Sequence, residues 1–458
     1  MNRDPLDRSG PSVPLVTAVH MGYGHLRAAH ALATELGTTV TRADHAPWAR
    51  GWELALWRGS RSVYEGLSRA SQRRRLATLL RPALDLLTHI DPVATDEPEN
   101  GRQRPVPPSL HARQLARLAH RGLSHSVVEA ARDAGAPLLS TFFVPALAAD
   151  VLRYRDAYCV VTDADLSRAW VPAEAGGTPV SYLAPSGQAA RRLRTYGVPA
   201  DRVLVTGFPL PGELLGGPDL VTLRQALARR LVRLDPRGVF LEPNRREIER
   251  HLGPLPARDR GPLEVTCAIG GAGAQSGLVR RLLAGLRSAL EAGGVRLCLV
   301  AGVRETLADR FRDWILEAGL EGGPVDVLAA DSLESYFQRF NRRLATTDLL
   351  WTKPSELTFF GALGLPLLLA PPVGSHEAFN RRWAMERGAA LAQPWPEATA
   401  SWLGVQRDRG ALAAAAWAGF RRLPNRGLYR IVERVTGPRR PPAARLAPAP
   451  SSREASPA

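Results

Sequence analysis

The chain has 458 residues, 45% of them hydrophobic and 23% charged, a composition that is typical of globular domains and excludes a largely disordered protein. Its net charge is +16, but the arginines are spread along the chain without interleaved aromatic residues, which favours an anionic lipid surface over nucleic acid as a partner. The sequence has no run of about 18 apolar residues, so any membrane contact is expected to be peripheral.

Short apolar runs alternate with helix-length segments along the chain, a pattern that predicts parallel sheets covered by helices. Each half of the chain holds enough runs for its own Rossmann-like domain. The predicted strands are 15–19, 38–42, 137–143, 157–162, 180–184 and 202–206 in the first half, and 263–269, 295–301, 325–329, 348–351 and 366–370 in the second.

Composition shifts divide the chain into six segments. A glycine-, proline- and arginine-rich stretch separates the two halves, and the last residues are rich in alanine, proline and serine. The expected segments are a disordered N-terminus (1–13), an acceptor domain (14–208), a linker and insertion (209–262), a donor domain (263–406), C-terminal helices (407–436) and a disordered tail (437–458).

The cysteines, Cys159, Cys267 and Cys298, each lie inside an apolar, strand-like run. No pair of them has the spacing of a metal or redox site, so they are expected to be small core residues. Unpaired cysteines suit the reducing cytoplasm, with a peripheral position on the inner face of the plasma membrane as the further expectation.

The region 48–87 combines apolar, tryptophan and basic residues. Trp52, Leu56 and Val63 fall near one helical face, and the basic cluster 73–75 follows. Basic amphipathic helices of this kind lie in membrane interfaces. The alternative is a core helix, which predicts that Trp52 and Leu56 are fully buried.

The first predicted strand ends in a glycine turn that enters a helix, with Gly22, Tyr23, Gly24 and His25 in succession. The glycines allow the backbone to approach a ligand, and the free N–H groups of the new helix suit an anion. At this position the helix dipole is expected to lower the pKa of His25, which favours the neutral imidazole of a general base. A simple helix cap is the alternative.

The first strand of the second half ends in a similar turn, 270–276, which suits a diphosphate but lacks the Gly-Lys-Ser/Thr of a nucleotide-hydrolysing loop. Lys353, the only lysine among 60 basic residues, follows another strand in this half. Lysine and arginine differ in hydration and donor geometry, so its survival predicts a specific ligand contact at the sheet edge. The alternative is a chance lysine on a solvated loop.

In this order, the motifs resemble those of the GT-B glycosyltransferases related to monogalactosyldiacylglycerol synthase, bacterial diacylglycerol glucosyltransferases and the lipid-linked N-acetylglucosaminyltransferase of peptidoglycan synthesis. The resemblance also rests on 161–163 followed by Trp170, on 205–209, and on 374–380. It implies an α/β GT-B fold, with two Rossmann-like domains and a cleft between them.

The resemblance further implies transfer from a nucleotide-sugar donor in the second domain to an acceptor, often a lipid, in the first. This transfer inverts the anomeric centre and needs neither an obligatory metal nor a cofactor. The expected catalytic residues are His25 and Asp163, and the expected acceptor-side residues are Gly22, Tyr23, Gly24, Arg168 and Trp170. The expected donor-binding residues are Gly270, Gly271, Gly273, Gln275, Lys353, Ser355, Glu356, Thr358, Gly374, His376, Glu377 and Asn380.

The chain departs from the family pattern at three places. The glutamate that binds the donor ribose is not evident after Thr358, a histidine usual before Trp170 is absent, and His376 stands where glutamine is usual. Glu356 is a candidate replacement for the missing carboxylate. These departures keep two other functions open: a non-catalytic GT-B-like protein that binds a nucleotide or anionic lipid, and a nucleotide-sugar epimerase.

Overall fold

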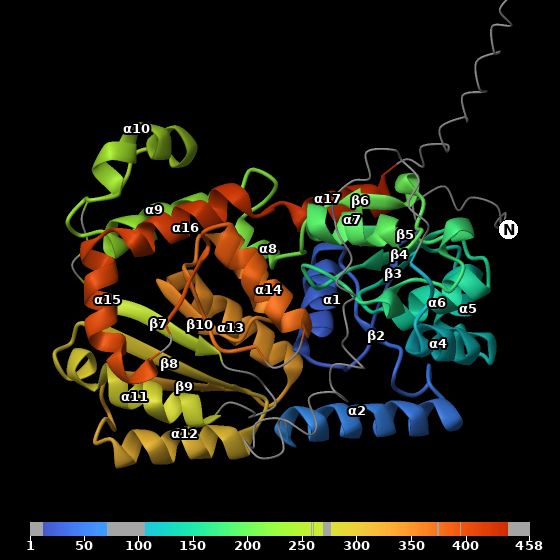
Figure 1. The fold of residues 1–458 in the computed structure, drawn as a ribbon, viewed down its shortest axis with the longest axis horizontal. Helices are drawn as coiled ribbons and strands as arrows, with labels where there is room; N and C mark the ends of the chain where they lie inside the picture. Colours follow the sequence, from blue (N-terminus) through green and yellow to red (C-terminus); the bar gives the residue numbers. More distant parts are fainter. Residues whose placement is uncertain are drawn as a thin grey trace, which may run out of the picture.

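The computed structural model describes residues 12–70, 106–257, 259, 261–268, 276–372, 375–393 and 395–437. This part of the chain forms two parallel six-stranded sheets, which lie in two halves of the molecule (Figure 1). Every strand run predicted above contains a strand. The structure adds β12 (Ala390–Leu391), which is too short to leave a pattern in the sequence.

The first sheet has the strand order β2-β1-β3-β4-β5-β6. The order reverses between β1 and β3, and the carboxyl ends of strands at such a reversal form the usual ligand site of an open α/β sheet. The strands are β1 (Leu15–Ala18), β2 (Thr41–Arg42), β3 (Leu138–Ser140), β4 (Ala157–Val160), β5 (Ser181–Ala184) and β6 (Val203–Val205). The helices of this half are α1 (Tyr23–Glu35), α2 (Trp52–Ala70), α4 (Leu110–His120), α5 (His125–Asp133), α6 (Phe143–Val151) and α7 (Gly187–Thr195).

Both faces of the first sheet are buried, which explains why its strands are continuous apolar runs. Side chains alternate between the faces: Leu138 packs into one core cluster and Leu139 into the other. Cys159 and Val160 likewise pack into different core clusters. The three cysteines are buried core residues, as predicted.

The second sheet has the order β9-β8-β7-β10-β11-β12, which is the Rossmann order 3-2-1-4-5-6. Its reversal lies between β7 and β10. The strands are β7 (Leu263–Ala268), β8 (Val295–Gly302), β9 (Val325–Ala329), β10 (Leu349–Thr352) and β11 (Leu367–Leu369), with β12 at the edge. The helices are α11 (Ser276–Glu291), α12 (Glu305–Glu317), α13 (Leu333–Thr346), the 3-10 helix η4 (Glu356–Leu363), α14 (Ser375–Glu386), α15 (Thr399–Asp408) and α16 (Ala411–Arg422).

The segment expected to be a linker and insertion contains α8 (Gly212–Leu215), α9 (Val221–Leu234) and α10 (Leu241–Leu252). Leu223, Leu227 and Leu231 of α9 are buried in the core that also holds η4. After α16, the chain crosses back to form α17 (Gly427–Thr436), which packs against α1 in the first half (Figure 1). The two halves are thus joined at two places along the chain.

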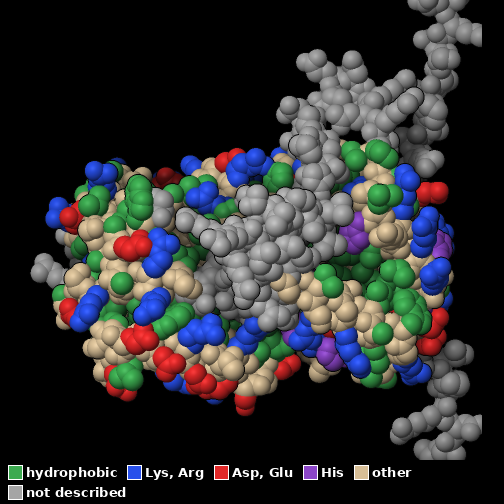
Figure 2. Space-filling model, turned by 60° about the horizontal axis from the view of Figure 1, so that its bottom comes forward, with side chains coloured by type: hydrophobic (Ala, Val, Ile, Leu, Met, Phe, Trp, Pro, Cys, Tyr) green, Lys and Arg blue, Asp and Glu red, His purple; other side chains and the backbone are tan. Residues whose placement is uncertain are grey.

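Two surface properties bear on partners. In the described residues, no helix is both long enough and apolar enough to cross a membrane. On the face in Figure 2, basic and acidic side chains are interspersed over the described residues, so the positive charge is not gathered into a single patch there.

Candidate functional site

A cleft lies between the two halves and is lined from both of them. The first half contributes the loops after β1 and β4, and the second half contributes the ends of β7 and β8 and the loop after β10. Two Rossmann-like domains with such a cleft at their carboxyl edges have the GT-B arrangement, which confirms the predicted fold class. The predicted site residues that line it are Gly22, Tyr23, Gly24, His25, Asp163, Lys353, Ser355, Glu356 and His376.

His25 is held at the start of α1 by the first half of the molecule. Gly22 precedes the helix with φ = 106°, a backbone angle that favours glycine. His25 Nδ1 lies 2.8 Å from the carbonyl oxygen of Thr141 and 3.0 Å from Thr162 Oγ1. A carbonyl oxygen only accepts, so Nδ1 carries the proton and Nε2 carries the lone pair.

The surroundings of His25 favour this neutral form. Burial is the largest effect and lowers the pKa of His25, and His376 lowers it further. The carboxylates of Asp163 and Glu356 act in the opposite sense and raise it, without reversing the net direction. His25 is therefore neutral at pH 7, and the charged form of its ring would face two carboxylates.

Asp163 is held by a residue from the other domain. Its Oδ1 accepts a hydrogen bond of 3.1 Å from Nδ2 of Asn380 in α14. Asn380 is fully buried and also accepts from the backbone N–H of Ala164 at 2.8 Å. Asn380 was expected to bind the donor, but its observed contacts are with protein atoms of the cleft wall.

Lys353 lines the cleft at the end of β10, and its side chain is 31% exposed. Its Nζ donates to Glu377 Oε1 at 3.0 Å. Glu377 is almost completely buried, so it holds the ammonium group and does not face the cleft itself. The only lysine of the chain is thus an oriented cation at the carboxyl edge of the second sheet.

Glu356, the candidate ribose ligand, is also in the cleft. Its Oε1 lies 3.5 Å from Nε of Arg27, which comes from α1 of the other half. The Arg27 guanidinium is buried and lies 4.6 Å from the ring centre of Phe340 and 4.8 Å from that of Phe337. Gly24 leaves room for the Glu356 side chain, because a Cβ at position 24 would lie only 3.2 Å from Glu356 Oε2.

Among the lining residues that were not predicted as site residues, five carry ionisable side chains: His20, Arg27, Arg61, Arg304 and Tyr336. The sequence held a signal for two of them, since His20 directly follows the predicted strand 15–19 and Arg27 is one turn after Tyr23 on α1. Burial, Arg61 and Arg42 lower the pKa of His20 to about 4, so this second histidine is neutral as well.

The remaining predicted residues lie elsewhere. Arg168 is buried, donates to backbone carbonyls, including that of Pro172 at 2.9 Å, and does not line the described cleft. Trp170 is buried with its ring 6.1 Å from that of His25, and Thr358 is buried in η4 behind the cleft wall. The predicted residues Gly270, Gly271, Gly273, Gln275 and Gly374 lie outside the described residues.

Within the residues that the structure describes, no group of three or more His, Cys, Asp or Glu side chains is arranged to hold a metal ion. No family model matches this chain, and no curated protein matches it in sequence.

Comparison with solved structures gives distant likenesses over nearly the whole chain. A UDP-GlcNAc 2-epimerase from Neisseria meningitidis, bound to UDP-GlcNAc, is 11% identical, with 91% of this chain and 98% of that one covered and a TM-score of 0.46. MurG of Acinetobacter baumannii is 14% identical, with 92% of this chain and 98% of that one covered and a TM-score of 0.45. The glycosyltransferase SnogD of Streptomyces nogalater is 14% identical, with 91% of this chain and 99% of that one covered and a TM-score of 0.39. Likenesses at this identity and TM-score do not identify an activity.

Proposed function

We propose that this protein transfers a sugar from a nucleotide-sugar donor, bound by the second domain, to a hydroxyl group of an acceptor bound by the first. The observation that carries the proposal is the neutral His25 at the cleft, with its proton on Nδ1 and the Asp163 carboxylate nearby, opposite the oriented ammonium of Lys353.

The proposed reaction is a single displacement. Nε2 of His25 takes the proton of the acceptor hydroxyl while the acceptor oxygen forms a bond to the anomeric carbon. The bond between that carbon and the diphosphate oxygen breaks, and the nucleoside diphosphate leaves with the electron pair. Attack from the opposite face inverts the anomeric centre. Asp163 stabilises the imidazolium that forms, because its carboxylate favours the charged ring.

The leaving diphosphate needs positive charge on the donor side. Lys353 supplies it from the end of β10, next to β7 in the sheet. The donor loop after β7, residues 270–275, is proposed to add backbone N–H groups. Glu377 keeps the Lys353 ammonium in place at 3.0 Å, so little reorganisation is needed during the reaction.

The acceptor is proposed to be a lipid that the protein meets at the inner face of the plasma membrane. Trp52 is 47% exposed and Val63 is 54% exposed on α2, which contradicts the alternative of a fully buried core helix. Exposed Arg58 lies on the same helix, and Arg61 of α2 lines the cleft. An apolar and basic helix beside the cleft suits an anionic membrane surface.

A second candidate function is nucleotide binding without turnover. It is favoured by Glu356, which is paired with Arg27 in the structure instead of being exposed for a ribose hydroxyl. Breaking this pair would leave the buried Arg27 without its counter-ion, which costs free energy.

The test is a screen of the full chain against uridine, guanosine, adenosine and thymidine diphosphate sugars, with and without diacylglycerol or undecaprenyl-phosphate-linked acceptors in detergent. We expect nucleoside diphosphate release with at least one donor, and a loss of about 10²- to 10⁴-fold in His25→Gln. Binding without release supports the second candidate. Isomerised sugar without released diphosphate supports an epimerase, and no binding to any donor contradicts both proposals.

A further inference from the structure

Asn380 of α14 is fully occupied by hydrogen bonds within the protein. Its Oδ1 accepts from the N–H of Ala164 at 2.8 Å, and its Nδ2 donates to Asp163 Oδ1 at 3.1 Å and to the carbonyl oxygen of Pro354 at 3.2 Å. An amide nitrogen has two hydrogens, and both are used here. The side chain is also fully buried. Asn380 therefore has no donor left for a ligand.

The partners of Asn380 belong to both halves of the molecule. Pro354 and α14 are in the second half, whereas Asp163 and Ala164 follow β4 in the first, more than 200 residues away in sequence. The N–H of Ala164 requires an oxygen and the carbonyl of Pro354 requires an N–H, so the orientation of the amide is fixed by its neighbours. These contacts exist only while the two halves are together.

We infer that Asn380 is a positioning residue that couples the closed arrangement of the two domains to the placement of Asp163 beside His25. When the domains close, the Asn380 amide fixes one carboxylate oxygen of Asp163, and the charge then acts on His25. When they separate, this anchor is lost. The inference rests on His25 as the base of the proposed function, but its first test does not need turnover.

The readout is the titration of His25. The charged or titratable groups that face it in the described cleft are Asp163, Glu356 and His376, and the two carboxylates raise its pKa. If Asn380 fixes Asp163, removing the amide weakens this effect, and the pKa of His25 falls further below its usual value. A variant that only lost packing would not change the pKa of His25 in particular.

The experiment is NMR titration of the histidine Cε1 signals in the full chain, with His25→Gln to assign the His25 signal among the 10 histidines. We expect Asn380→Leu, which is close to asparagine in shape, to move the midpoint of His25 to lower pH. Asp163→Asn should do the same. In the Asp163→Asn background, the added Asn380→Leu change should have little further effect, because both act on the same charge.

Asn341 provides a matched control, since it is a buried asparagine on α13 that does not line the cleft. Asn341→Leu should leave the His25 midpoint unchanged, and Asn380→Ala serves as a second variant if Asn380→Leu does not fold. An unchanged midpoint in the Asn380 variants, or an equal shift in both Asp163 backgrounds, would overturn the inference.

Turnover separates positioning from donor binding. With an active donor, Asn380→Leu should lower kcat about 10- to 100-fold while the KM for the donor stays the same. A raised donor KM with unchanged kcat and an unchanged His25 midpoint would restore the donor-binding role. If no donor is turned over, the titration still decides whether Asn380 acts on His25.

Discussion

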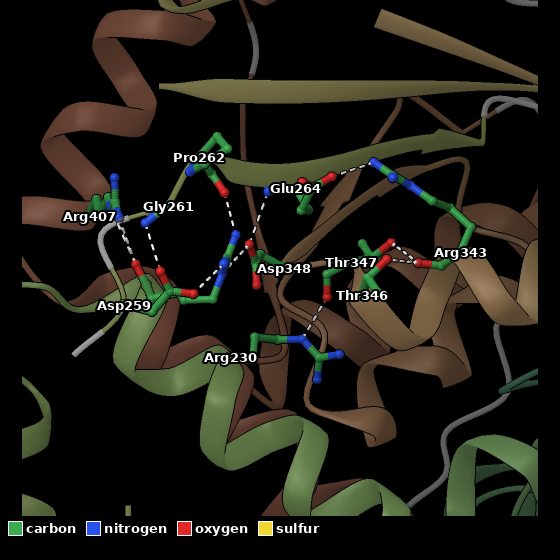
Figure 3. Close-up of polar contacts among 11 residues, drawn as sticks. Arg230, Asp259, Gly261, Pro262, Glu264, Arg343, Thr346, Thr347, Asp348 and Arg407 are labelled. Carbon is green, nitrogen blue, oxygen red and sulfur yellow. Dashed lines mark hydrogen bonds and ion pairs between the residues drawn. The ribbon is translucent and has the colours of Figure 1, made fainter. Parts of the chain in front are cut away.

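Arginine and carboxylate side chains form contacts at both ends of the second sheet. The two sets of contacts differ in whether they join residues around one sheet or residues of both halves. At the amino end, Arg233 donates to Asp348 Oδ2 at 2.9 Å. The same oxygen accepts from the N–H of Glu264 at 2.9 Å (Figure 3). The buried Arg230 donates to the carbonyl oxygen of Thr347 at 2.8 Å. All these residues pack around one sheet.

At the carboxyl end, two contacts cross between the halves. Arg27 reaches from α1 to Glu356, and Asn380 reaches from α14 to Asp163. Nη1 of Arg27 has no hydrogen-bond partner within the described part of the chain. The amino-end contacts therefore stabilise one domain, whereas the contacts of Arg27 and Asn380 depend on how the two domains are placed.

The largest effect is expected from Asp348→Ala at the amino end. This change leaves the N–H of Glu264 and Nε of Arg233 without their acceptor, so the free energy of unfolding should fall by about 3 kcal/mol. Denaturant unfolding measures it, and donor binding should be unchanged. A large loss of donor binding in a variant that remains folded would break the division between the two ends.

Asp348→Asn is the matched control, because its amide oxygen still accepts both hydrogen bonds. Burial raises the pKa of Asp348 above its usual value, so the ionised form is disfavoured in the folded protein. Relative to Asp348→Asn, the natural protein should therefore lose stability as the pH rises from about 4 through the raised pKa. A gain in relative stability over this range would contradict the direction of the shift.

An intermediate effect is expected from Lys353→Arg at the carboxyl end. The larger, planar guanidinium cannot keep the 3.0 Å contact with the buried Glu377 and present the same point charge to a diphosphate. Affinity for the nucleoside diphosphate, measured by calorimetry, should fall about tenfold, with unchanged stability. Arg296→Lys, at an exposed position of β8, is the control. Equal affinity in Lys353→Arg would show that the survival of one lysine has no functional meaning.

The same comparison shows what the sequence could predict. His25 and Lys353 were predicted as site residues because they follow apolar strands, and the carboxyl ends of parallel strands meet at one edge. Both line the cleft. The strand runs were visible because both faces of each sheet are buried.

Contacts between the halves could not be predicted in this way. The hydrogen bond from Arg27 to the Tyr336 hydroxyl joins residues 309 positions apart in the sequence. The periodicity of apolar residues cannot predict a contact between residues so far apart. Thr358 was expected at the donor site, but the turn of η4 places it in the core. The roles of Glu377 and Asn380 depend on the partners that folding brings to them, and their residue types fitted ligand contact equally well.

The smallest effect is expected on the surface of the first half, at α2. The double change Trp52→Ser and Arg58→Ser removes exposed apolar area and one positive charge. Each basic residue near an anionic surface contributes about 1 kcal/mol, so sedimentation with vesicles rich in phosphatidylglycerol should weaken several-fold. Trp395→Ser is the control, because Trp395 is 67% exposed in the other half. Binding should decrease at high salt and on replacing the cluster 73–75, which lies outside the described residues. Equal losses in the α2 and Trp395 variants, or binding indifferent to salt, would contradict a specific membrane contact by α2 and leave the cleft without a proposed route for a lipid acceptor.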